Sequence, residues 1–149
     1  MAYVARYQTS SGKLAVYMRR KLNERGWEGA EDPPVGEIVD RFVALGYVDD
    51  QNYATARAAA LAGRGYGPRR VADALRAAGV DQSRISGAHQ NEDEARRIAH
   101  IYAKRRRIGP YSTKEASRDQ IRKWITAMIN AGHAYPLARE IAIQPRAED

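Results

Sequence analysis

The sequence contains no cysteine among its 149 residues, which excludes disulfide bonds, thiolate metal sites and a cysteine nucleophile. No apolar run approaches the ~18 residues that a membrane-spanning helix needs. The first 20 residues carry charged and polar side chains where a signal peptide needs an apolar stretch. These absences predict a cytoplasmic protein with no membrane partner.

Signals for β-strands are also scarce. The sequence has one phenylalanine and no Asn-Gly or Asp-Gly pair that would mark a hairpin turn. Alanine, leucine and arginine, which favour helix, are abundant. The sequence therefore predicts an all-α protein, with helices near 13–25, 35–45, 50–62, 68–78, 82–89, 91–107, 115–131 and 135–143, and a shorter helix over 2–8.

Positive charge is in excess but unevenly spread. The chain has 25 Lys and Arg against 18 Asp and Glu, a net charge of +7. Residues 1–50 carry a net charge of −1, whereas 51–91 and 92–149 carry +4 each. A basic surplus favours a nucleic acid or an acidic protein as partner. Such a partner is expected to meet the middle and last thirds of the chain first.

Glycine recurs at an interval of 53 residues, at Gly26, Gly79 and Gly132. Each follows an apolar helical pattern, and glycine readily takes the left-handed conformation that ends a helix. The residues four and eight positions earlier are apolar and share one helix face, namely Leu22, Leu75, Met128, Met18, Val71 and Trp124. We therefore predict an elongated array of three tandem three-helix repeats. A chance likeness between glycine-ended helices is the alternative.

We place the repeats at residues 1–48, 49–90 and 91–144, with an acidic loop at 28–34 and a frayed tail at 145–149. Apolar side chains such as Leu45 mark the helix that follows the first glycine. Trp27 and Trp124 occupy helix ends or repeat-equivalent apolar positions, so both are predicted to pack in the core.

The predicted helix over 91–107 separates apolar from basic residues. Ala95, Ile98, Ala99 and Tyr102 form a stripe that should face the core. The basic residues lie on another face or at the helix end: Arg97, His100, Lys104, Arg105, Arg106 and Arg107. They are candidates for contacts with DNA phosphates or with carboxylates of a protein. A solvated face, whose terminal charges are favoured by the helix dipole, is the alternative.

A second candidate set surrounds the Gly65-Tyr66-Gly67 segment. Its residues are Arg64, Tyr66, Arg69, Arg70 and Arg76. Arg57, expected near the Asp49-Asp50 pair, is a further candidate contact residue. The two glycines are expected to let the backbone approach a partner, and Tyr66 is expected to be exposed and to stack on a base or fill an interface. A flexible loop before a helix that begins at Pro68 is the alternative.

A third set lies in the helix predicted over 115–131. Arg122 and Lys123 are its candidate contact residues, and Lys114 and Arg118 precede them. Glu115 and Asp119 are interleaved with these cations, so ion pairs within the helix account for much of the pattern.

Catalytic and metal-binding patterns are missing. Asp49 and Asp50 are adjacent carboxylates, but no third ligand follows at a suitable spacing, so we interpret them as a helix cap with first-turn charge. The three histidines form no zinc motif. We therefore predict no enzyme activity, no cofactor and no metal. A metal-dependent nuclease that uses Asp49 and Asp50 is a remote alternative.

Several segments resemble the RecX family. Residues 46–54, with a glycine, an aromatic, an aliphatic, two aspartates and an aromatic-alanine pair, match its signature. Residues 65–71 and 75–80 follow at the expected distance, and Leu14, Met18, Leu22 and Gly26-Trp27 resemble its first repeat. The third repeat is similar more loosely, because His133 stands where an apolar residue is more usual.

The resemblance implies a function that composition does not. RecX proteins are non-enzymatic regulators that bind the RecA–DNA filament and usually suppress its ATPase, recombinase and co-protease activities, within DNA repair and the SOS response. It implies that the RecA filament and single-stranded DNA are partners, with double-stranded DNA as a further candidate, and we expect a monomer. A stand-alone, sequence-independent DNA-binding protein is the alternative.

Overall fold

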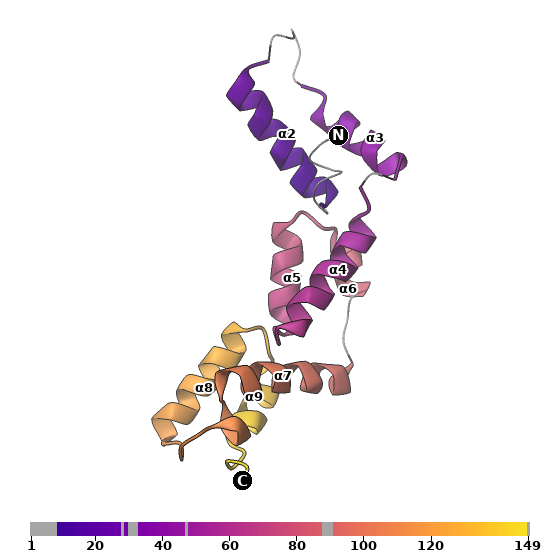
Figure 1. Cartoon of the computed structure of the whole chain (residues 1–149). Coiled ribbons are helices and arrows are strands. Elements are labelled where there is room, and N and C mark those ends of the chain that lie inside the picture. The colour runs from indigo at the N-terminus through magenta and orange to yellow at the C-terminus, as the bar shows by residue number, and fades with distance from the viewer. Residues whose placement is uncertain (1–8, 28, 30–32, 47, 88–90, 149) are drawn as a thin grey trace. The chain divides into compact units, whose positions relative to one another are not determined.

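The computed structural model describes residues 9–27, 29, 33–46, 48–87 and 91–148. Within these ranges the chain is helical and has no strand, so the predicted all-α class is confirmed (Figure 1). The elements are α2 (Ser11–Arg25), α3 (Val35–Ala44), α4 (Asp50–Gly63), α5 (Pro68–Ala77), α6 (Gln82–Gly87), α7 (Glu92–Arg106), the 3-10 helix η1 (Gly109–Tyr111), α8 (Arg118–Asn130) and α9 (Tyr135–Ala142).

Two helices begin later or earlier than predicted because serine caps them. The Ser10 hydroxyl accepts a hydrogen bond from the Lys13 amide, so α2 begins at Ser11. Ser117 caps α8 in the same way, and the chain before it contains η1. The helix predicted over 2–8, most of the acidic loop over 28–34, and His89 lie outside the described residues.

The repeat-related glycines end helices as predicted. Gly26, Gly79 and Gly132 have φ angles of 79°, 74° and 99°, in the left-handed region that glycine tolerates. At Gly132, the His133 amide donates to the Met128 carbonyl (3.1 Å), a bond that closes the last turn of the helix. α7 ends in the same conformation on Arg107 (φ 56°), although arginine has a Cβ.

The contacts divide the chain into two compact units. Unit 1 comprises residues 1–56 and 75–87, and unit 2 comprises residues 57–74 and 88–149. Each unit thus combines parts of two consecutive predicted repeats, and α4 and α5 contribute to both. The repeat boundaries stay a prediction, because these units follow different limits.

The core of unit 1 joins α2 to α3. Leu14, Val35, Val39 and Val48 are buried, and Met18, Leu22 and Phe42 pack against them. The predicted burial of Trp27 was wrong, because its side chain is 49% exposed. In α3, Val35 and Val39 are buried, whereas Leu45 at the end of the helix is 63% exposed.

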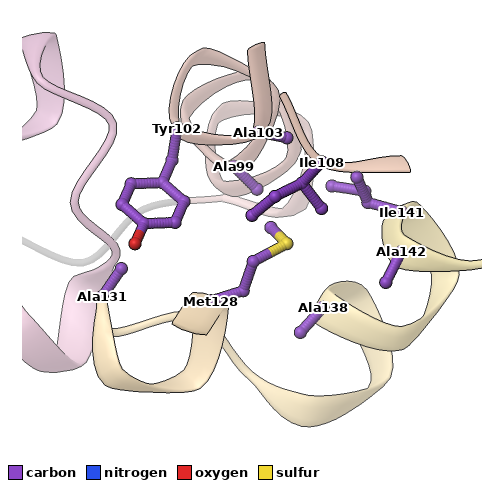
Figure 2. Packing of buried hydrophobic residues seen from close by; sticks show 9 residues of the cluster. All are labelled: Ala99, Tyr102, Ala103, Ile108, Met128, Ala131, Ala138, Ile141 and Ala142. Carbon is purple, nitrogen blue, oxygen red and sulfur yellow. The ribbon is translucent and has the colours of Figure 1, made fainter. Parts of the chain in front are cut away.

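The core of unit 2 lies where α7, α8 and α9 meet (Figure 2). Ile108, Met128 and Ile141 are almost completely buried, and each contributes roughly 1.5–3 kcal/mol through burial. The remaining members are mostly alanines, whose small side chains let the helices approach closely: Ala99, Ala103, Ala131, Ala138 and Ala142. Trp124 packs against this cluster, as predicted.

In unit 1 the start of α2 packs on the turn at Gly79, which follows α5. We call this contact the Gly79 junction. The Ser10 hydroxyl donates to the Ala78 carbonyl, and the Asp50 carboxylate accepts from the Ser11 amide (2.6 Å) and hydroxyl (2.5 Å). A Cβ on Gly12 would lie 2.6 Å from the Gly79 Cα, so the two backbones are in direct contact. The end of α5 is thereby held against the start of α2.

Candidate functional site

The Gly65-Tyr66-Gly67 segment packs on the turn that ends α8, and we call this contact the Gly132 junction. The Gly67 amide donates to the Ala131 carbonyl (2.8 Å), and the Arg69 amide donates to the Gly132 carbonyl (3.2 Å). These bonds satisfy free carbonyls at the end of one helix with free amides at the start of another. A Cβ on Gly65 would lie 2.6 Å from the Tyr102 Cα. The expectation that both glycines admit a partner was therefore wrong, because the protein's own backbone occupies that space.

The buried side chain of His133 stabilises this junction through a hydrogen bond. Its side chain is 1% exposed, and its Nε2 lies 2.8 Å from the Gly65 carbonyl oxygen, to which the neutral ring donates. Burial lowers the pKa of His133 below its usual 6.5, and the hydrogen bond to Gly65 opposes this only in part. Nδ1 is buried without a hydrogen-bond partner. Sequence reasoning missed this role; only the unusual residue type at this repeat position signalled it.

In the Gly65-Tyr66-Gly67 segment, the Tyr66 ring lies close to two arginines. The Arg70 guanidinium lies 4.7 Å from the centroid of the Tyr66 ring, and that of Arg105 lies 5.6 Å from it. Tyr66 is half-buried against the unit 2 core, so it is less exposed than predicted. A hydrogen bond from Arg105, followed by the charges of Arg105, Arg70 and Arg64, lowers the pKa of the Tyr66 hydroxyl.

A second tyrosine, Tyr102, is buried beside Tyr66. The Tyr102 ring centroid lies 6.3 Å from that of Tyr66, and Arg105 and Arg106 each lie 5.8 Å from the Tyr102 ring. Two sets predicted separately from the sequence are thus brought together. We call the five residues Tyr66, Arg70, Tyr102, Arg105 and Arg106 the arginine–tyrosine cluster.

Two predicted contact residues are engaged by neighbouring acids. Arg97 forms two hydrogen bonds with the Glu94 carboxylate, at 2.6 and 3.1 Å, and Arg122 lies 3.4 Å from Asp119. Each pair is exposed and spaced three residues apart on one helix. Such pairs contribute little to stability, but they lower the net charge that a partner meets.

The other predicted cations are exposed. Arg76 belongs to unit 1, where its Nε donates to the Gln82 side chain (3.4 Å). Arg107 is exposed at the left-handed end of α7. The remaining residues present their side chains to solvent in unit 2: Arg57, Arg64, Arg69, Lys104 and Lys123.

The aspartate pair has a structural role. Asp49 caps α4 through a hydrogen bond from the Asn52 amide (3.0 Å), as predicted, while Asp50 binds the start of α2. In the part of the chain that the structure describes, no group of three or more potential ligands is placed to hold a metal ion. Nor is any described helix both long and apolar enough to cross a membrane.

The helices end on left-handed turns, and arginines surround tyrosine rings in unit 2. These features define a helical-repeat protein with a cluster of arginines on unit 2. A family profile described as "RecX, second three-helix domain" matches residues 49–88. A regulatory protein RecX from Myxococcus xanthus (strain DK1622) is 26% identical over 150 residues, which cover 93% of this chain and 79% of that protein. The RecX of Mycobacterium sp. (strain JLS) is 31% identical over 115 residues, 72% of this chain and 61% of the relative.

A solved structure has the same fold. The crystal structure of a regulatory protein RecX aligns with a TM-score of 0.69 at 18% sequence identity, covering 94% of this chain and 66% of that one. The chain belongs to the RecX family of regulatory proteins.

Proposed function

We propose that this protein is a non-enzymatic, cytoplasmic regulator that binds the RecA–single-stranded DNA filament and inhibits its ATPase, recombinase and co-protease activities. The family supplies the regulatory class. The observation that carries the contact chemistry is the arginine–tyrosine cluster, in which Arg70 and Arg105 flank Tyr66.

The cluster suits a polyanionic partner for two reasons. Arginine makes bidentate, charge-assisted hydrogen bonds with phosphate or carboxylate groups. A tyrosine ring offers a face on which a base can stack, and this is worth roughly 1–3 kcal/mol per base. Because the Gly132 junction fixes the Tyr66 backbone, little conformational entropy is lost when a partner binds.

A RecA ATPase titration tests the proposal. The full-length chain is added to RecA on single-stranded DNA, and we expect ATP hydrolysis to slow. An unchanged rate at several-fold molar excess contradicts the proposal. The double variant Arg70→Gln/Arg105→Gln should need about tenfold more protein for the same inhibition, a loss of ~1.4 kcal/mol. Arg139→Gln, an exposed arginine of unit 2 outside the cluster, is the matched control and should inhibit as the wild type does.

The second candidate is a DNA-binding protein that needs no recombinase, and the same cluster favours it. Its affinity for bare DNA should be high and should fall steeply between ~50 and ~200 mM salt, because each neutralised phosphate releases counterions. Weak binding to bare single- and double-stranded DNA, together with tight binding to the filament, rejects this candidate and favours the regulator.

A further inference from the structure

Unit 1 contains a cationic cavity that the sequence did not reveal. It has a volume of about 360 Å³ and lies where the start of α2 meets the end of α5. Its lining includes Lys13, Tyr17 and Arg20 from α2, and Arg76 from α5. None of the described residues that line it is acidic. The net charge of residues 1–50 is only −1, so the charge distribution along the sequence did not indicate this site. The acidic residues that balance the charge there do not line the cavity.

Cations of the lining lie close to aromatic rings, as they do in unit 2. Arg20 lies 5.6 Å from the centroid of the Tyr17 ring, which also lines the cavity, and Lys13 lies 5.2 Å from that of Tyr53, which is buried outside the lining. Lys13 and Tyr17 stand 53 positions before Tyr66 and Arg70, so one repeat places an aromatic and a cation where the other has them in reverse order. Arg20 also lies 3.8 Å from Glu24, but this pair is exposed and therefore weak.

Part of the cavity lining has few or no side-chain atoms. Gly12 and Gly79 line it, and their backbones are in contact, since a Cβ on Gly79 would lie 2.7 Å from the Gly12 Cα. Backbone without side chains, together with an aromatic ring in the same lining, leaves room for a planar group. Val16 also lines the cavity, is 65% exposed and adds apolar surface for such a group.

We propose that this cavity is a second nucleic-acid site, which binds one nucleotide of a single strand. The phosphate contacts Lys13, Arg20 and Arg76, and the base lies against Tyr17. This inference rests on the proposed function, because it assumes a nucleic-acid partner, and it adds a contact in unit 1 to the contact in unit 2. Two weak sites on one strand release it more slowly than either site alone.

The lining favours a nucleotide over an acidic peptide. A carboxylate would use the three cations but neither the tyrosine ring nor the glycine backbone of the lining. A nucleotide uses all three features, because it joins a phosphate to a planar base and a sugar.

Fluorescence anisotropy with a labelled oligo-dT of about 15 nucleotides tests the phosphate contact in the full-length chain. Arg20→Gln should weaken binding about threefold or more and reduce the salt slope by ~0.7. Arg19→Gln removes the same charge from the next residue of α2, outside the cavity, and should change little. Equal losses in the two variants, or no loss in Arg20→Gln, overturn the site. The comparison is repeated in the Arg70→Gln/Arg105→Gln background, where the remaining affinity should depend on Arg20 more strongly.

The base contact has its own test. Tyr17→Leu should weaken binding to oligo-dT but not to an abasic strand of the same length, and Tyr17→Phe should bind both as the wild type does. Equal losses for both strands mean that Tyr17 contacts no base, which overturns that part of the proposal.

Competitors identify the ligand class. Thymidine monophosphate should displace the strand from the cluster-deficient protein at lower concentration than inorganic phosphate. An oligo-glutamate of equal charge that competes as well as oligo-dT, with the same sensitivity to Arg20→Gln, assigns the cavity to a protein partner and rejects the proposal. If Arg20→Gln binds DNA normally while the cluster variant loses RecA inhibition, only this second site fails. If the wild type does not inhibit RecA at all, the proposed function fails.

Discussion

In unit 1 the turn that ends α5 accepts a hydrogen bond from a side-chain hydroxyl, whereas in unit 2 the turn that ends α8 accepts hydrogen bonds from two main-chain amides. At the Gly79 junction the Ser10 hydroxyl donates to the Ala78 carbonyl, while the Asp50 carboxylate accepts from Ser11 at the start of α2. The Gly132 junction uses the amides of Gly67 and Arg69, and its buried imidazole has no counterpart in unit 1, where Val80 takes the equivalent position.

The comparison shows that both junctions satisfy the hydrogen-bonding groups at helix ends, but with different donors and acceptors. The last carbonyls of a helix need donors, and the first amides of a helix need acceptors. Placing the start of one helix on the end of another supplies both. The two junctions differ in the groups that form these hydrogen bonds, and the contribution of each can be measured.

The largest expected effect is at Gly67. A Cβ there would lie 2.7 Å from His133 Nδ1 and in conflict with the Gly132 backbone, which has no room to move. We expect Gly67→Ala to lower the free energy of unfolding by about 3 kcal/mol. Urea unfolding should be followed by Trp124 fluorescence in a Trp27→Phe background, which reports on unit 2. Gly63→Ala in α4 is also in unit 2, and nothing lies within 4 Å of its added Cβ, so this control should be neutral or stabilising by up to about 1 kcal/mol.

A pH titration separates the two junctions next. The pKa of His133 is lowered in the folded protein, so the unfolded chain binds the extra proton first as the pH falls below 6.5. The stability of unit 2 is therefore complete above pH 6.5 and declines below it, by at most about 1.4 kcal/mol per pH unit. His133→Val, which copies Val80, should remove this part of the slope. Parallel pH profiles for the variant and the wild type would contradict the assignment.

At the Gly79 junction the expected cost is smaller. Asp50→Asn replaces a carboxylate that accepts from both Ser11 donors by an amide with one acceptor oxygen, so we expect a loss of about 1 kcal/mol. Asp49→Asn is the matched control, because asparagine caps a helix as well as aspartate does. Urea unfolding followed by circular dichroism measures both. Equal losses would show that the link between α4 and α2 adds nothing to ordinary capping.

The smallest expected effect is a gain. Arg107 holds the left-handed end of α7, where glycine is favoured, so Arg107→Gly should raise the free energy of unfolding by about 0.5–1 kcal/mol. Arg106→Gly, one residue earlier and helical, should instead lower it by a similar amount. If Arg107 contacts the partner, as the sequence analysis predicts, the stabilised variant should also bind oligo-dT more weakly. A loss of stability in Arg107→Gly would refute the strain argument.

Most of the helices could be predicted from the sequence because their signals are local. Gly79, Gly132 and the cap at Asp49 each act within a few residues, and the structure confirms all three. Whether an apolar side chain is buried depends on distant neighbours, and for this reason the burial predicted for Trp27 was wrong.

The candidate site was predictable in its parts but not in its assembly. Tyr66 and Arg70 could be singled out as neighbours in the sequence, as could Arg105, but the contact between the two sets spans 39 residues. The bond between His133 and Gly65 spans 68 residues. No periodicity or spacing rule reaches that far, so only the folded chain brings these groups together.

Each unit combines parts of two predicted repeats, and this limits which segments can be duplicated or excised without loss of stability. Residues 49–88, the segment that matches the family profile, contain α5 but neither Ser10 nor Gly132. If that segment were excised, the amides before and at the start of α5 and the carbonyl after its end would lose their hydrogen-bond partners. A duplication that adds a stable repeat must therefore copy all 53 residues between successive glycines, so that each new glycine turn comes with a helix start that packs on it.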